Sequence, residues 1–278
     1  MVRRIACALA VAAVAVAVLA SPASAADTAN RRAPTQYLAL GDSLAFGYQP
    51  TKVFNQGYVN QLYARLHARD PRLALTNLGC PGETTRTFRY GGLCPYPGGA
   101  SQLDTAVAFL RAHRHSVRLV TIDIGGNDVD GCFSATAIDS ACVTNGLRTI
   151  AANLAPAVRR LREAAPDVTV VGMTYYDPAL ADWFNGAAGQ AVAKASVRLT
   201  GELNGLLTIL YRSGRFRVAD VARAFSTYDM TTIVNGVPLD VLRICQWTWM
   251  CAPAPLGPDI HPNTTGYGVI AHSFAAVL

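Results

Sequence analysis

The stretch YLALGDSLAFGY, residues 37–48, places a Gly-Asp-Ser tripeptide directly after a short apolar run. The apolar run has the composition of a buried strand. Ser43 is open to two interpretations. It is an ordinary turn residue, since Gly, Asp and Ser all favour turns, or it is a nucleophile at the carboxyl end of a strand, where α/β folds place their chemistry. The stretch alone favours the turn, so the rest of the chain has to decide.

Apolar runs that resemble strands alternate with segments of helical periodicity. The runs lie at residues 37–40, 73–78, 119–124, 168–175 and 216–221. Over residues 143–165 and 189–211, apolar side chains recur at three- and four-residue steps, as on one face of a helix. Strands separated by helices pair in parallel through right-handed crossovers. We therefore expect an α/β fold, a three-layer α/β/α sandwich with about five parallel strands buried on both faces.

The N-terminal 25 residues have the pattern of a secretory signal peptide. Arg3 and Arg4 precede an apolar run at residues 5–20, and an A-x-A sequence ends at Ala25. An uncleaved membrane anchor is the alternative, but the run is shorter than the ~20 residues that a span needs. We expect a signal peptide over residues 1–25, a polar leader over 26–34 and one domain over 35–278. A secreted, extracellular protein follows.

Charge and cysteine content narrow the class further. The 24 basic and 18 acidic residues leave a formal net charge of +6. The basic residues are scattered, so nucleic-acid binding is not indicated. Besides Cys7, the cysteines form three close couples, and an even number in an exported chain argues for disulfides. Sequential pairing is the simplest scheme: Cys80–Cys94, Cys132–Cys142 and Cys245–Cys251. The spacing does not suit a zinc site.

Two regions do not fit the alternation of strands and helices. Residues 84–99 and 222–258 are rich in Gly, Pro and aromatic side chains. We expect loops there that either line a binding site or simply cover the surface.

Chemically useful residues follow the expected strands. They lie at residues 41–43 (Gly-Asp-Ser), 77–84 (Asn-Leu-Gly-Cys-Pro-Gly-Glu-Thr), 125–128 (Gly-Gly-Asn-Asp) and 259–263 (Asp-Ile-His-Pro-Asn). In a parallel sheet these segments converge at the carboxyl edge. Together they supply a serine, glycine N–H donors, an asparagine amide and a histidine, which are the components of acyl transfer. This convergence favours the interpretation of Ser43 as a nucleophile over its interpretation as an ordinary turn residue.

The order of these four motifs resembles the SGNH hydrolases, also called the GDSL esterase/lipase family, from residue 37 to about residue 271. Secreted bacterial members with three sequential disulfides look most similar. The resemblance implies a flavodoxin-like SGNH-hydrolase fold with Ser43 as nucleophile and His261 as the base that moves its proton. It also implies an oxyanion hole made by the N–H groups of Ser43 and Gly82 and the side chain of Asn127, with Gly79 as the rival of Gly82.

The orienting acid departs from the family pattern. The usual spacing is D-x-x-H, but Pro258 stands three residues before His261 and Asp259 stands two before it. We assign Asp259 to the catalytic set, with a backbone carbonyl as the alternative that some members use. The chain does not match the G-x-S-x-G motif of α/β-hydrolases, because position 45 is alanine.

These observations predict a secreted serine ester hydrolase of the lipase or phospholipase type that needs no metal or cofactor. We expect a monomer that acts on small-molecule or lipid esters and contacts lipid surfaces transiently. A carbohydrate O-acetylesterase is the first alternative, and a catalytically inactive binding protein on the same scaffold is the second.

Overall fold

The computed structural model describes residues 34–278, so the expected signal peptide lies outside the described residues. A five-stranded parallel sheet in the order β2-β1-β3-β6-β7 forms the centre of this part of the chain. Its strands are β1 (Thr35–Gly41), β2 (Leu73–Asn77), β3 (Val117–Asp123), β6 (Thr169–Met173) and β7 (Arg217–Ala219). The predicted three-layer α/β/α sandwich with about five parallel strands is confirmed. The strand order is that of flavodoxin-like folds.

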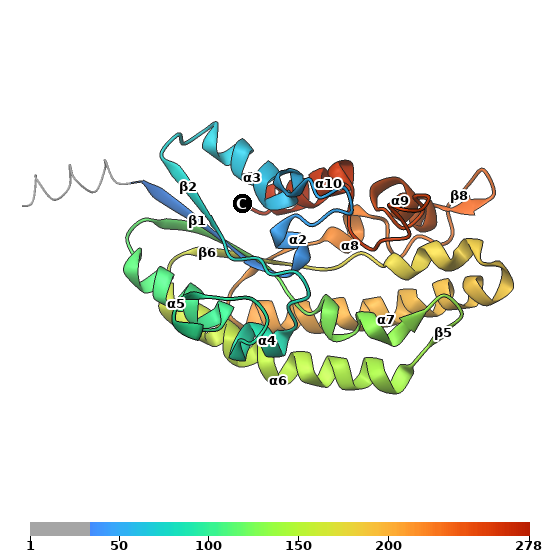
Figure 1. The fold of residues 1–278 in the computed structure, drawn as a ribbon, viewed down its shortest axis with the longest axis horizontal. Helices are drawn as coiled ribbons and strands as arrows, with labels where there is room; N and C mark the ends of the chain where they lie inside the picture. Colours follow the sequence, from blue (N-terminus) through green and yellow to red (C-terminus); the bar gives the residue numbers. More distant parts are fainter. Residues whose placement is uncertain (1–33) are drawn as a thin grey trace, which may run out of the picture. The chain divides into compact units, whose positions relative to one another are not determined.

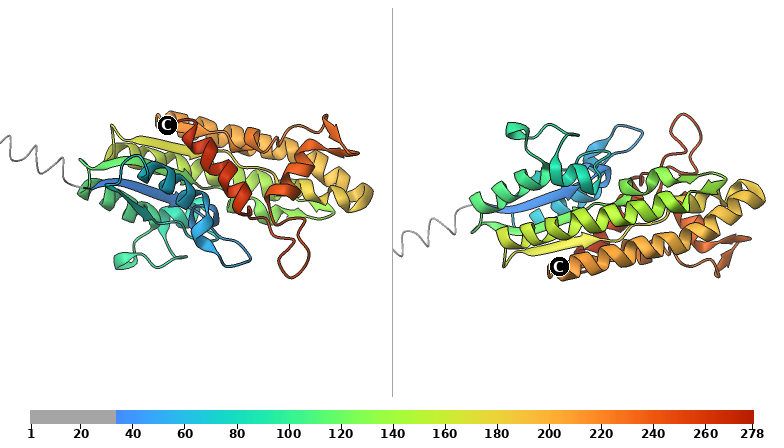
Figure 2. Two further views of the ribbon diagram at one scale, coloured as in Figure 1. Left: turned by 90° about the horizontal axis from the view of Figure 1, so that it is seen from above. Right: turned by 90° about the horizontal axis from the view of Figure 1, so that it is seen from below.

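Helices cover both faces of the sheet (Figure 1). One face carries α3 (Tyr58–His67) and α10 (Thr264–Ala275), which pack against each other. On the other face lie α5 (Gln102–Ala112), α6 (Ser140–Ala164) and α7 (Gly186–Ser213), with α6 and α7 running side by side in both views of Figure 2. Helices α6 and α7 are the two segments whose apolar periodicity predicted helices. Their apolar faces are buried, and no helix among residues 34–278 has the length and apolarity to cross a membrane.

The remaining elements are short and lie near the ends of the sheet. The short helices are α2 (Ser43–Phe46), α4 (Thr85–Tyr90), α8 (Val221–Ala224) and α9 (Leu239–Trp247). Two antiparallel ribbons are formed by β4 (Phe133–Ser134) with β5 (Ala137–Ile138) and by β8 (Ile233–Val234) with β9 (Val237–Pro238). The 3₁₀ helices are η1 (Phe54–Gln56), η2 (Pro97–Gly99), η3 (Gly126–Asp128), η4 (Asp130–Cys132) and η5 (Pro178–Phe184).

The expectation of plain loops at residues 84–99 and 222–258 was wrong in part. The first region contains α4, where Thr84 and Thr87 form a reciprocal capping box. The second contains the β8–β9 hairpin and the nine-residue helix α9. Helix α9 forms because Val241 and Ile244 are buried against the core. Both helices lie in stretches without Gly or Pro inside regions that are otherwise rich in these residues, and tertiary burial stabilises them despite their short length.

The strand order fixes where a site forms. The chain passes from β1 to β2 on one side and later enters β3 on the other side of β1. The connections after β1 and β3 therefore diverge at the carboxyl ends of these two central strands and leave a crevice between them. Residues 41–43 and 125–128 follow these two strands, which brings the first and third motifs of the sequence to the crevice.

Candidate active site

Ser43 begins helix α2 on a tight turn directly after β1. Gly41 has a φ of +141°, and a Cβ at this position would lie 2.3 Å from the backbone oxygen of Asp123, so only glycine fits. The side chain of Asp42 caps the helix by accepting the Leu44 N–H at 2.9 Å. The N–H of Ser43 itself has no acceptor among the described residues, which leaves it available to a ligand.

His261 reaches the serine from near the C-terminus, just before α10. Its Nε2 lies 2.8 Å from Oγ of Ser43, and its Nδ1 lies 2.7 Å from Oδ1 of Asp259. The backbone N–H of His261 donates to the same Asp259 oxygen at 2.9 Å. With the proton on Nδ1, Nε2 is free to accept the proton of the serine hydroxyl. The carboxylate two residues before the histidine thus reaches the imidazole despite the altered spacing.

The environment keeps Asp259 ionised. Burial alone would raise the pKa of Asp259, but the two hydrogen bonds and the charge from His261 outweigh it and hold that pKa below its ordinary value. Both side chains are largely shielded, at 14% exposure for His261 and 23% for Asp259. Hydrogen bonds to its backbone hold the segment between α9 and α10 in place, since the Trp249 N–H donates to the His261 carbonyl at 3.0 Å and the Tyr176 hydroxyl donates to the Ile260 carbonyl at 2.7 Å.

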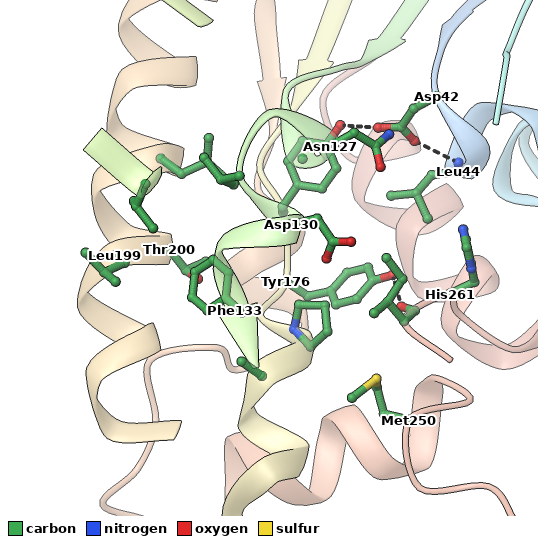
Figure 3. A pocket seen from close by; sticks show the side chains of 18 of the residues that line it. Asp42, Leu44, Asn127, Asp130, Phe133, Tyr176, Leu199, Thr200, Met250 and His261 are labelled. Atoms are coloured by element: carbon green, nitrogen blue, oxygen red, sulfur yellow. Dashed lines mark hydrogen bonds between the residues drawn. The ribbon is translucent and has the colours of Figure 1, made fainter. Parts of the chain in front are cut away.

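Asn127 enters the site from η3, just past the end of β3. Its amide nitrogen donates to the Glu83 carbonyl at 2.9 Å. A primary amide has two N–H donors, so this contact orients the side chain and leaves the second donor for a ligand. Asn127 lines the same pocket as Ser43 and His261 (Figure 3).

The two rival glycines of the second motif differ in their contacts. The Gly79 N–H already donates to Oδ1 of Asn77 at 2.9 Å, and a Cβ at Gly79 would lie 2.5 Å from the backbone nitrogen of Phe46. Gly79 therefore serves the close packing of this turn against α2. The Gly82 N–H, by contrast, has no acceptor among the described residues, and Gly82 has a φ of +82° that glycine adopts without strain. Gly82 is the glycine with a free donor.

Two buried carboxyl groups lie beneath the nucleophile. Asp42 accepts a hydrogen bond from Tyr175 at 2.9 Å, and Asp123 accepts from Tyr58 at 2.5 Å and from the Ala45 N–H at 3.1 Å. Burial raises the pKa of both carboxyls, and the nearby charge of Asp42 pushes that of Asp123 well above its ordinary value. Two adjacent buried carboxyls do not both ionise at low cost, and the hydrogen bonds that they accept hold the turn that carries Ser43.

Gln102, at the start of α5, links the serine turn to the second motif. Its amide accepts the Gly41 N–H at 2.6 Å and donates to the Gly41 carbonyl at 2.9 Å. The same amide nitrogen lies 3.0 Å from a carboxylate oxygen of Glu83, next to Gly82. Gln102 is fully buried. It therefore sets the position of the Gly82 turn relative to the turn before Ser43.

Several of these supporting residues were not among those named from the sequence. Asp123 has a detectable signal, because it is an acid within the apolar run at residues 119–124. Gln102 has none, since a glutamine after the helix cap Ser101 is common and its partners are distant in the chain. Asp128 accepts from the N–H of Thr85 at 2.8 Å and from its hydroxyl at 2.6 Å, which joins the third motif to α4.

A cavity of about 340 Å³ extends from the Ser43–His261 pair. Asp42, Asn127 and Tyr176 lie close to the pair, whereas Phe133 and Leu199 line the far part (Figure 3). Most of its lining is apolar, with Val129, Phe133, Val143, Leu199, Leu203 and Met250 among the side chains. The cavity can therefore hold an apolar chain next to a polar reacting centre.

The three disulfides join the cysteines in sequential order, as predicted: Cys80–Cys94, Cys132–Cys142 and Cys245–Cys251. The second fastens η4, on the wall of the cavity, to the start of α6. The third closes a loop ten residues before His261. Among residues 34–278, no three or more His, Cys, Asp or Glu side chains are grouped as a metal site requires.

Comparison with known proteins identifies the family. Residues 39–269 match the model of the GDSL-like lipase/acylhydrolase family. Among solved structures, phospholipase A1 from Streptomyces albidoflavus is similar, with a TM-score of 0.56 and 18% sequence identity over 88% of this chain and 100% of its own. A lipase from a goat rumen metagenome is also similar, with a TM-score of 0.55 and 16% identity over 87% of this chain and 97% of its own. Comparison with curated protein sequences gave no match. The chain therefore belongs to the GDSL-like lipase/acylhydrolase family.

Proposed function

We propose that this protein is a serine ester hydrolase of the lipase or phospholipase type, acting on carboxylic esters through an acyl-enzyme. One observation carries the proposal. Ser43, His261 and Asp259 form a continuous hydrogen-bonded relay, with distances of 2.8 and 2.7 Å, at one end of an apolar cavity. A relay of this kind activates a hydroxyl that is otherwise a weak nucleophile at neutral pH.

In the acylation step, Oγ of Ser43 attacks the ester carbonyl carbon while Nε2 of His261 takes the hydroxyl proton. The Asp259 carboxylate stabilises the imidazolium that forms. Negative charge develops on the carbonyl oxygen, where the N–H groups of Ser43 and Gly82 and the amide of Asn127 serve as donors. Each such donor typically contributes ~2.7–4 kcal/mol to the transition state.

The tetrahedral intermediate then collapses. The bond from the carbonyl carbon to the alcohol oxygen breaks, and His261 returns its proton to the leaving alcohol. The acyl group stays on Ser43 as an ester. A water molecule attacks this ester with His261 again as base, and release of the carboxylic acid restores the serine hydroxyl.

The cavity supports an acyl-lipid substrate. An acetyl group would leave the part lined by Val143 and Leu199 unfilled, whereas a longer acyl chain buries apolar surface there. The fold is shared with a phospholipase A1, and we extend a lipid-directed activity to this chain as part of the proposal.

We also propose that the protein is exported, acts as a monomer and contacts lipid surfaces transiently. Three disulfides support export, because such bonds persist in oxidising compartments.

Hydrolysis of p-nitrophenyl esters from acetate to palmitate tests this function, with Ser43→Ala as the blank. We expect Ser43-dependent hydrolysis with an optimum at medium or long chains. Activity confined to acetate would favour a carbohydrate O-acetylesterase. Labelling with a fluorophosphonate separates the last alternative, since an inactive binding protein would leave Ser43 unmodified.

A further inference from the structure

One carboxylate in the cavity takes no part in the relay. Asp130 begins η4 and lines the cavity together with Ser43, Asn127 and His261. It is exposed, and its carboxylate accepts no hydrogen bond from any described residue. Figure 3 shows its carboxyl group pointing into the cavity near the Tyr176 side chain.

The charges around Asp130 are unbalanced. The cavity lining includes no lysine or arginine, although the whole chain carries a net charge of +6. Two other carboxylates line the cavity, but Asp42 is bonded to Tyr175 and Asp182 accepts from Asn185 at 3.0 Å. Asp130 is thus the lining carboxylate whose oxygens remain open to a ligand.

The surroundings of Asp130 suit a cation. The cavity walls cover part of this exposed side chain and raise the pKa of Asp130, so its charged form is less well solvated than in bulk water. A cationic ligand group would supply the missing charge partner. The aromatic side chain of Tyr176 lines the same part of the cavity, and aromatic faces attract quaternary ammonium groups. Tyr176 is close enough for the charge of Asp130 to act on its hydroxyl.

The position of Asp130 indicates which part of an ester it meets. The apolar far end of the cavity suits the acyl chain, so the alcohol portion lies near His261, which protonates it. Figure 3 shows Asp130 beside Tyr176, on the His261 side of Phe133 and Leu199, which places its carboxylate on the side of the alcohol. In a choline ester the positively charged nitrogen lies three bonds beyond the ester oxygen, so it can approach the carboxylate of Asp130.

We propose that Asp130 is a specificity-determining residue that selects esters whose alcohol portion carries a quaternary ammonium group. The inference rests on the proposed ester hydrolase function and adds a substrate class to it. Asp130 acts on the substrate directly and leaves the relay of Ser43, His261 and Asp259 unchanged.

A matched pair of substrates tests the proposal. Butyrylthiocholine and 3,3-dimethylbutyl thiobutyrate have nearly the same shape and differ in one positive charge. Thiol release reports kcat/KM for each. We expect the wild type to prefer the cationic ester by about 5- to 30-fold, because the exposure of Asp130 keeps the interaction of the two charges close to its strength in bulk water. Asp130→Asn should lower this preference to about 1 and change the rate on the neutral ester less than about 3-fold.

Two further variants serve as controls. Asp130→Glu keeps the charge and should retain most of the preference. Asp167→Asn removes a carboxylate just before β6, at the opposite end of the sheet, and should behave like the wild type.

Three outcomes would overturn the proposal. The first is a wild type that cleaves p-nitrophenyl butyrate but cleaves butyrylthiocholine no faster than its neutral counterpart. The second is the same preference in Asp130→Asn as in the wild type. The third is an equal loss on both esters in Asp130→Asn, which would mean that Asp130 acts through His261. Failure of the proposed function itself looks different, because no ester would then be cleaved in a Ser43-dependent way.

Discussion

Replacing Asp259 by asparagine and by alanine should have clearly different effects on catalysis. One oxygen of Asp259 accepts both the ring Nδ1–H and the backbone N–H of His261, at 2.7 and 2.9 Å. An asparagine must keep its carbonyl oxygen at that point, because a rotated amide would direct its NH₂ group against the backbone N–H. Asp259→Asn therefore retains the productive tautomer of His261 and loses only the charge, whereas Asp259→Ala loses both the charge and the orientation.

The expected sizes follow from the geometry. Charges about 4 Å apart interact by ~4 kcal/mol at an effective dielectric constant of 20 and by ~1 kcal/mol in water. For this partly shielded pair we take ~2 kcal/mol, which lowers kcat/KM of Asp259→Asn about 30-fold. Loss of the orienting hydrogen bond costs a further ~1–1.5 kcal/mol, so Asp259→Ala should fall about 300-fold.

The assay is hydrolysis of p-nitrophenyl butyrate, with Ser43→Ala as the blank and thermal unfolding as the control for folding. Equal losses in the two variants would refute the reasoning about the shared oxygen. Losses below about 3-fold in both would show that Asp259 does not orient His261 and would favour a backbone carbonyl.

Three more perturbations test the supporting structure. Asn127→Ala should lower kcat about 10²- to 10³-fold with little change in KM, and a loss seen mainly in KM would speak against an oxyanion donor. Gln102→Leu strands the buried N–H of Gly41 and removes one of the hydrogen bonds to the carboxylate of Glu83, so the free energy of unfolding measured in urea should fall by ~2–4 kcal/mol; a change below ~1 kcal/mol would contradict the linking role. Burial raises the pKa of Asp177 to about 6, so its protonated form stabilises the fold below pH ~4, and this contribution disappears as pH rises through 6. Relative to Asp177→Asn, the wild type should therefore lose roughly 2 kcal/mol of stability between pH 4 and pH 7, and parallel stability curves would refute it.

The layers of the fold were predictable because their signals are local. Unbroken apolar runs mark strands that are buried on both faces, and the apolar periodicity of residues 143–165 and 189–211 marks the helices α6 and α7 that cover the sheet. Helix α9 was missed because Gly and Pro elsewhere in residues 222–258 favoured loops for the whole region, although residues 239–247 contain neither. Its packing against η5 stabilises this short helix.

The candidate site could likewise be predicted from the sequence only in part. Its principal residues could be named from four short motifs, because each follows a strand and parallel strands end at one edge. The motifs could not decide between Gly79 and Gly82, or between Asp259 and a backbone carbonyl. Those choices depend on which N–H is already bonded and on which oxygen reaches the imidazole ring, at distances of 2.9 and 2.7 Å.

Local patterns in the sequence were enough to predict the α/β architecture, the simplest scheme of cysteine pairing and the residue types available for acyl transfer. The tertiary structure was needed to show that Gln102 links Gly41 to Glu83, that Tyr175 and Tyr58 donate to the buried carboxyls of Asp42 and Asp123, and that Asp130 faces the cavity without a partner. The physical reason is separation along the chain. Local patterns report on burial and backbone conformation, whereas hydrogen bonds and charge interactions between distant residues exist only after the sheet has brought its strand ends together.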